Sequence, residues 1–179
     1  GRNVVYLGTI SKTLSPMMRI GYLVVPQELQ DVCATAKQLF DRHSPVTEQE
    51  ALASLIESGG YESHVRRVRR LNRDRRETLL NALQRAFGER ITVEGADAGL
   101  HVVVWFNELP RSSETHLLQI ARRAGIGVYC ISPLYDPQPG TVTADRLGLV
   151  MGYSALSPRQ IDRGIQLLLI AIETVTEEF

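Results

Sequence analysis

Two apolar runs near the start of the chain flank a short polar loop, and they constrain the fold more than any other feature. The runs are VVYLG at residues 4–8 and IGYLVVP at residues 20–26. Runs that are apolar at nearly every position are typical of strands covered on both faces, as in a parallel sheet. We therefore predict two strands of a parallel sheet, with the chemistry in the loop between them. Because the chain begins without Met and close to such a strand, we expect it to be part of a longer protein.

Helical patterns follow the second strand. Two helices are predicted at residues 27–37 and 44–57, the second opening on a proline that needs no backbone N–H. A long helix is predicted at residues 61–87, because several of its apolar residues approximate one stripe. These residues are Val65, Val68, Leu71, Leu79, Leu83 and Ala86.

Beyond Gly88 the pattern changes to short elements. Strands are predicted at residues 91–94, 99–106, 126–130 and 147–153, helices at 112–124 and 158–176, and one long loop at 132–145. This order predicts an α+β unit with mainly antiparallel pairing, distinct from the α/β remnant before it. We place the domain boundary near residue 60, which separates residues 1–60 from residues 61–179.

A specific motif runs from Gly8 to Tyr22. It reads GTISKTLSPMMRIGY, and it resembles the lysine segment of the fold-type I aminotransferases that use pyridoxal phosphate (PLP), whose form is G-[ST]-x-S-K-T-L-x-P-x-x-R-[IL]-G-[YW]. The resemblance implies that residues 1–60 are the end of the large PLP-binding domain. Residues 61–179 would then be the interdomain helix and the small C-terminal domain.

The resemblance also assigns roles to four residues. Lys12 is the catalytic residue that would hold PLP through a Schiff base, while Thr9 and Arg19 would bind its phosphate, with Ser11 a weaker candidate. A semi-buried loop favours the partly deprotonated amine that such a lysine needs. Hydroxyl donors and a forked guanidinium suit a phosphate. The alternative is that Lys12 and Arg19 are ordinary solvated charges.

Two features of the second predicted domain favour a regulator over an enzyme. Residues 95–106, GADAGLHVVVWF, resemble a strand of the MocR-type branch of the GntR regulators, in which A-G-L-H is common. Aminotransferases of this fold bind the substrate carboxylate with an arginine late in the small domain, and alignment on residues 152–154 puts Val150 there. A buried valine cannot bind a carboxylate, and Arg146 is roughly 13 Å away at ~3.3 Å per residue.

Composition limits the classes of partner. Lys and Arg number 20, as do Asp and Glu, so net charge provides no general reason to expect nucleic acid or an anionic membrane. Cys33 and Cys130 form no CxxC pattern and the histidines show no ligand spacing, which argues against disulfides and metal and favours the cytoplasm. The apolar runs are shorter than the roughly 20 residues of a membrane span.

The sequence therefore predicts part of the PLP-binding, aminotransferase-like effector domain of a MocR/GntR-type transcription regulator. Residual catalysis is left open, and the alternative is a class I/II aminotransferase acting on an amino acid through Lys12. The resemblance implies a homodimer, a small amino-acid-like or PLP effector, and DNA binding through an N-terminal domain outside this chain. We expect the chain by itself to bind PLP poorly.

Overall fold

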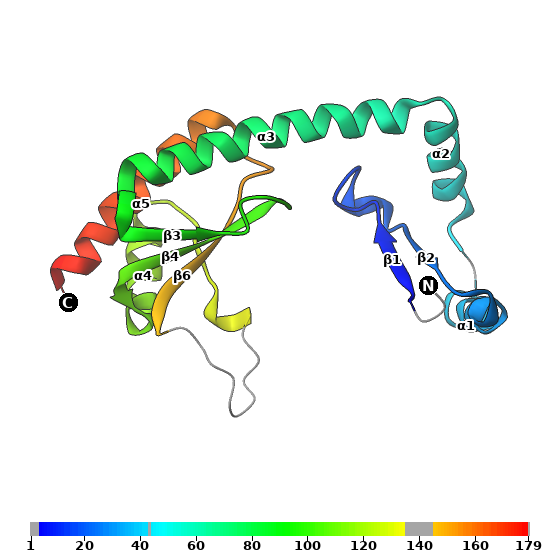
Figure 1. Ribbon diagram of the computed structural model, residues 1–179, viewed down its shortest axis with the longest axis horizontal. Coiled ribbons are helices and arrows are strands. Elements are labelled where there is room, and N and C mark those ends of the chain that lie inside the picture. The colour runs from blue at the N-terminus through cyan, green and yellow to red at the C-terminus, as the bar shows by residue number, and fades with distance from the viewer. Residues whose placement is uncertain (1–3, 43, 135–144, 179) are drawn as a thin grey trace. The chain divides into compact units, whose positions relative to one another are not determined.

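The computed structural model of the chain describes residues 4–42, 44–134 and 145–178. They belong to two compact units, Gly1–Arg70 and Leu71–Phe179 (Figure 1). Most of the long loop predicted at residues 132–145 lies outside the described residues. None of the described helices is long and apolar enough to cross a membrane.

The first unit contains an antiparallel hairpin. Strand β1 (Tyr6–Thr9) pairs with β2 (Gly21–Val24), with Tyr6 opposite Val24 and Thr9 opposite Gly21. The sequence predicts strands of a parallel sheet, but these two run antiparallel to each other, because parallel neighbours need a long crossover connection, whereas this loop returns the chain directly. Their apolar side chains are exposed, so the described residues do not provide the cover predicted on both faces.

Two helices follow the hairpin in the first unit. A 3₁₀ turn, η2 (Gln27–Leu29), precedes α1 (Gln30–Asp41), so the α-helix begins and ends later than the predicted residues 27–37. Helix α2 (Val46–Glu57) agrees closely with its prediction. Neither α1 nor α2 contains a buried residue, and both therefore present apolar side chains to solvent.

Helix α3 (Gly60–Phe87) confirms the predicted long helix and crosses the division between the two units. Its buried residues are Leu79, Ala82, Leu83 and Phe87, all near its C-terminal end. Burial along the stripe predicted from Val65 is therefore incomplete in the first half, where Val65 and Val68 are half-buried and Leu71 is 39% exposed. The reason is that a helix buries apolar residues only where another element covers it, and the core of the second unit begins at Leu79.

The second unit is built on a four-stranded sheet of order β3-β4-β6-β5, in which every pair is antiparallel, as predicted. The strands are β3 (Ile91–Glu94), β4 (His101–Pro110), β5 (Tyr129–Cys130) and β6 (Arg146–Gly152). Strand β5 is shorter than the predicted residues 126–130. Consequently, no described residue pairs as a strand with Met151 or Gly152 of β6 on that side of the sheet.

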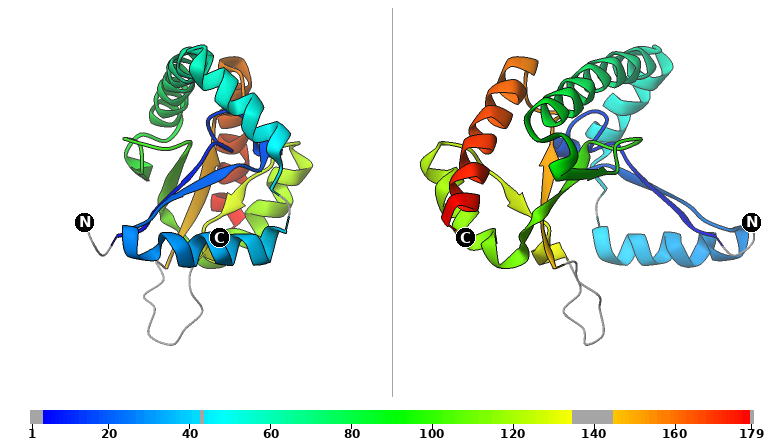
Figure 2. Two further views of the ribbon diagram at one scale, coloured as in Figure 1. Left: turned by 90° about the vertical axis from the view of Figure 1, so that its right-hand side faces the viewer. Right: turned by 60° about the vertical axis from the view of Figure 1, so that its left-hand side comes forward.

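The core of the second unit lies between one face of this sheet and three helices (Figure 2). The helices are α4 (Glu114–Arg123), α5 (Pro158–Glu178) and the end of α3. Alternate residues of β4 enter the core, and the ring of Phe106 meets that of Phe87 edge to face with 5.3 Å between centroids. The intervening residues of β4 and β6, including Trp105 and Val150, belong to the opposite face of the sheet.

Candidate functional site

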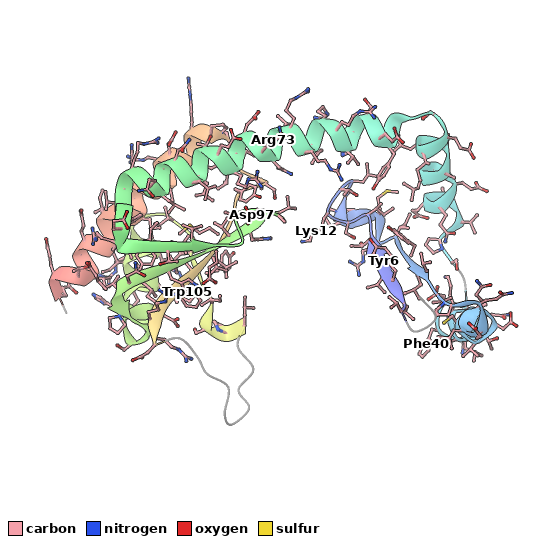
Figure 3. The ribbon with its side chains drawn as sticks, viewed as in Figure 1. Tyr6, Lys12, Phe40, Arg73, Asp97 and Trp105 are labelled. Carbon is pink, nitrogen blue, oxygen red and sulfur yellow. The ribbon has the colours of Figure 1, made fainter. Side chains whose placement is uncertain are left out.

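Residues 10–20 join β1 to β2 and carry Lys12, at the opposite end of the hairpin from α1 (Figure 3). Backbone hydrogen bonds close this lysine loop. The N–H of Ile10 donates to the carbonyl of Ile20 at 3.2 Å, and the N–H groups of Thr13 and Leu14 donate to the carbonyl of Ile10 at 3.1 and 2.9 Å. Ile10 is only 6% exposed, so its side chain anchors the turn on which Lys12 is displayed.

The second half of the loop is a short helical turn, η1 (Pro16–Met18). Ser15 caps the turn, because its Oγ accepts a hydrogen bond from the N–H of Met17 at 3.2 Å. Arg19 ends it with φ 50° and ψ 33°, in the left-handed region. A residue other than glycine adopts this conformation at a cost of roughly 1–2 kcal/mol.

The loop brings two of the predicted phosphate-binding residues together. Thr9 Oγ1 lies 3.0 Å from Ser11 Oγ and accepts a hydrogen bond from the Ser11 N–H at 3.2 Å. It also lies 3.3 Å from the carbonyl oxygen of Ile20. Arg19 is exposed, and its guanidinium has no hydrogen-bond or ion-pair partner among the described residues.

Thr9 and Arg19 line the same hollow of about 1020 Å³ in the first unit, between the hairpin, α1 and α2. Ser11 and Lys12 are not among its lining residues. Lys12 is exposed, although the loop around it is semi-buried as expected, with Ser11, Thr13 and Leu14 half-buried. The physical reason is that the neighbouring loop residues do not cover its side chain.

Tyr22 takes part in the structure of this region in a way that was not predicted. It lies opposite Gly8 in the hairpin, and a Cβ added to Gly8 would be 2.3 Å from Tyr22 Cζ. The ring centroids of Tyr22 and Tyr6 are 6.0 Å apart. Interaction with Tyr6, chiefly through hydrogen bonding, raises the pKa of Tyr22. The glycine and the tyrosine that begin and end the motif are therefore packed against each other.

Val150 lies on β6 in the second unit, opposite Val103 of β4 and Tyr129 of β5. It is half-buried rather than buried as predicted, because it lies on the face of the sheet opposite the core that the helices cover. An aliphatic side chain still offers a carboxylate no hydrogen-bond donor, so Val150 cannot take the place of a carboxylate-binding arginine.

Arg146 is held by two other residues of the second unit. Its guanidinium carbon lies 5.0 Å from the centroid of the Trp105 ring, and Nη1 donates to Asn107 Oδ1 at 3.0 Å. Both interactions fix the guanidinium at the start of β6. Arg146 is therefore not placed to substitute for an arginine at position 150.

Comparison with known sequences identifies transcription regulators as relatives. The chain is 34% identical over 165 residues to the uncharacterized HTH-type transcriptional regulator YhdI of Bacillus subtilis, covering 92% of this chain and 34% of that protein. It is 30% identical over 166 residues to the probable rhizopine catabolism regulatory protein MocR of Rhizobium meliloti, covering 92% and 32%. The chain thus spans about a third of the length of these relatives. No family model matches it.

Comparison with solved structures identifies the fold. The α-aminoadipate aminotransferase LysN of Thermus thermophilus matches with a TM-score of 0.83 and 24% identity, over 99% of this chain and 44% of that one. The kynurenine aminotransferase of Pyrococcus horikoshii matches with a TM-score of 0.82 and 25% identity, over 99% and 42%. The chain is thus a homologue of MocR-type transcription regulators, and it has the fold of the C-terminal part of the fold-type I PLP-dependent aminotransferases.

Proposed function

We propose that the whole protein binds PLP at the lysine loop, with Lys12 bonded to the cofactor and with Thr9, Ser11 and Arg19 around its phosphate. The observation that carries this proposal is the grouping of donors beside Lys12. Two hydroxyls lie 3.0 Å apart just before the lysine, and the guanidinium of Arg19 is free of partners among the described residues. The strained backbone of Arg19 supports the same role, because such strain is concentrated at binding sites.

This donor set fits a phosphate group. A phosphate accepts hydrogen bonds through oxygens that carry negative charge, and the hydroxyls and Arg19 all donate. Thr9 and Arg19 reach the same hollow, which lies next to the loop that carries Lys12. When bound, PLP supplies an aldehyde that takes an amine and a ring system that accepts electrons. The residues of this chain orient it and supply the amine.

Lys37 is the only other lysine in the sequence, and it is less suited to this role. Its amine is paired with Asp41 and also donates to Ser44 Oγ at 2.7 Å. An amine held by two partners must give up these contacts before it can bond to an aldehyde. Lys12 has no such partner among the described residues, which leaves its amine available.

We further propose that the protein regulates transcription and has little aminotransferase turnover. Support comes from the regulator relatives and from Val150, which lacks the donors that orient a substrate carboxylate. DNA binding would reside in a part of the protein outside this chain, and a small amino-acid-like molecule or PLP would be the effector. We also propose that the protein is a homodimer in the cytoplasm. The alternative, an aminotransferase, is favoured by the similarity to LysN.

Covalent attachment is tested by borohydride reduction of the PLP-loaded whole protein, followed by peptide mapping. The expected label is on the peptide that contains Lys12. Lys12→Ala should abolish the label, whereas the control Lys37→Ala should retain it. A label on Lys37, or an unchanged label in Lys12→Ala, would reject the proposed site.

Regulation is tested separately, by measuring affinity for the protein's own promoter with and without PLP and by assaying amino acids with a panel of keto acids. We expect PLP-dependent DNA affinity and slow turnover. Loss of an orienting bidentate contact costs several kcal/mol, or on the order of a thousandfold in rate. Rapid turnover without specific DNA binding would favour the aminotransferase.

A further inference from the structure

The first turns of α3 hold the residue that follows Lys12. The hydroxyl of Tyr61 lies 2.9 Å from Thr13 Oγ1, and Nε2 of His64 lies 2.9 Å from the carbonyl oxygen of Thr13. These contacts join residues that are 48 and 51 positions apart, and all three residues are half-buried. Helix α3 therefore fixes both the hydroxyl and the backbone carbonyl of Thr13.

The direction of each hydrogen bond follows from the neighbouring groups. Thr13 has one hydroxyl proton, which it donates to the carbonyl of Ile10 at 3.2 Å, so Tyr61 donates to Thr13.

Arg67 determines the tautomer of His64. Arg67 Nη2 lies 3.3 Å from His64 Nδ1, and a guanidinium can only donate, so Nδ1 is the acceptor. The ring proton is therefore on Nε2, which donates to the carbonyl of Thr13. Arg67 thus selects the tautomer of His64 that donates a hydrogen bond to the lysine loop.

We propose that Tyr61 and His64, the latter oriented by Arg67, are positioning residues for Lys12. Thr13 shares a peptide bond with Lys12, so fixing both the carbonyl and the side chain of Thr13 restricts the direction in which the lysine side chain leaves the loop. The carbonyl of Ile10, which accepts hydrogen bonds from the Thr13 and Leu14 N–H groups, completes the turn on the other side of Lys12. This inference rests on the proposed bond between Lys12 and PLP.

The test compares two ligands in the whole protein. PLP can bond to Lys12, whereas pyridoxamine 5′-phosphate has the same ring and phosphate but no aldehyde. His64→Leu and Tyr61→Phe should each weaken PLP binding about fivefold, the effect of one ordinary hydrogen bond. Both should leave the affinity for pyridoxamine 5′-phosphate unchanged. His64→Gln, which retains an N–H donor, should restore most of the PLP affinity.

A second readout needs no cofactor. Amide hydrogen exchange at Thr13 and Leu14 should become faster in His64→Leu and in Tyr61→Phe. The matched control is Glu62→Gln, because Glu62 is an exposed residue of the same helix and, within the part of the chain that the structure describes, its side chain pairs only with Arg66. This control should alter neither ligand affinity nor exchange.

Two results would overturn the proposal. If the variants weaken the binding of PLP and of pyridoxamine 5′-phosphate equally, the contacts shape the phosphate site or the fold rather than orient Lys12. If PLP affinity is unchanged, Tyr61 and His64 are not positioning residues. Tyr61→Phe, which loses a single oxygen atom, provides the test should His64→Leu fail to fold. Wild-type PLP affinity in Lys12→Ala would instead reject the proposed function itself, whatever the α3 variants do.

Discussion

The indole ring of Trp105 occupies the space that a side chain at position 148 would need. A Cβ added to Gly148 would lie 2.5 Å from Cζ3 of Trp105 and 2.6 Å from Cγ2 of Ile131. Trp105 is 5% exposed and carries Arg146 over its ring, so it cannot swing away freely. A glycine on β6 is thus required by the packing on the sheet face opposite the core.

Gly148→Ala should destabilise the protein by about 1–3 kcal/mol, the usual cost of overpacking a buried site. The measurement is the free energy of unfolding in urea. Gly127→Ala is the matched control, because a Cβ at Gly127 meets nothing within 4 Å. The control should change stability by less than about 0.5 kcal/mol. Equal effects of the two substitutions would contradict this account of Gly148.

Gly8→Ala should displace the side chain of Tyr22, which is less constrained than that of Trp105. The atoms that a new Cβ would meet belong to the far end of Tyr22, which is 52% exposed and can rotate away. Rotation separates Tyr22 from Tyr6, whose interaction raises the pKa of Tyr22. We therefore expect Tyr22 to ionise at a lower pH in the variant, as measured by ultraviolet titration with Tyr22→Phe to assign the signal. An unchanged titration would show that the two rings stay together.

Arg19 and Arg42 each have a strained backbone conformation with positive φ, but only Arg19 is proposed to bind phosphate. Arg19 has φ 50° and Arg42 has φ 52°. Substitution by glycine relieves about 1–3 kcal/mol of strain but loses about 0.4–1 kcal/mol to the freer unfolded chain. Arg19→Gly and Arg42→Gly should therefore each stabilise the protein slightly in denaturant titrations. Only Arg19→Gly should weaken PLP binding, and equal PLP affinities in the two variants would remove Arg19 from the phosphate site.

Cys130 should react slowly with alkylating agents. Burial, together with the negative charge of Glu114, raises the pKa of this thiol from 9.0 to about 11. At pH 8.5 the thiolate fraction is therefore small, and iodoacetamide should modify Cys130 much faster in urea than in the folded protein. Rapid alkylation of Cys130 in the folded state would contradict this prediction.

The same shift predicts a pH dependence of stability. Between about pH 9 and 11 the unfolded thiol has lost its proton while the folded thiol keeps it, so the stability contributed by Cys130 is present below pH 9 and is lost as pH rises through this range. Melting temperatures measured across this range should fall less steeply in Cys130→Ala than in the wild type. Parallel falls would show that the thiol makes no contribution.

The isolated 179-residue chain should self-associate and bind PLP weakly. Its first unit exposes apolar side chains on both the hairpin and α1, including Leu7 at 76% and Phe40 at 88%. Exposed strands and apolar patches favour pairing between chains. Sedimentation velocity should show concentration-dependent association that Phe40→Ser reduces. A monomer that binds PLP tightly in a one-to-one ratio would refute the prediction.

The sequence by itself determined the local features of this protein. The motif from Gly8 to Tyr22 indicated the lysine loop and its flanking strands, and the family resemblance that it carried agrees with the regulator relatives and the aminotransferase fold. The long helix and the antiparallel sheet of the second unit also followed from periodicity and element order, because these signals are contained in short segments of the chain.

Only the tertiary structure decided which distant residues meet. Strand register determines that β1 pairs with β2 and that Val150 is half-buried. It also determines that Arg146 contacts Trp105 and Asn107. The contacts from Tyr61 and His64 to Thr13 connect segments about fifty residues apart. Each residue in these contacts is compatible by itself with many partners, and the folded backbone selects one of them because it alone brings the donor and acceptor atoms within hydrogen-bond distance.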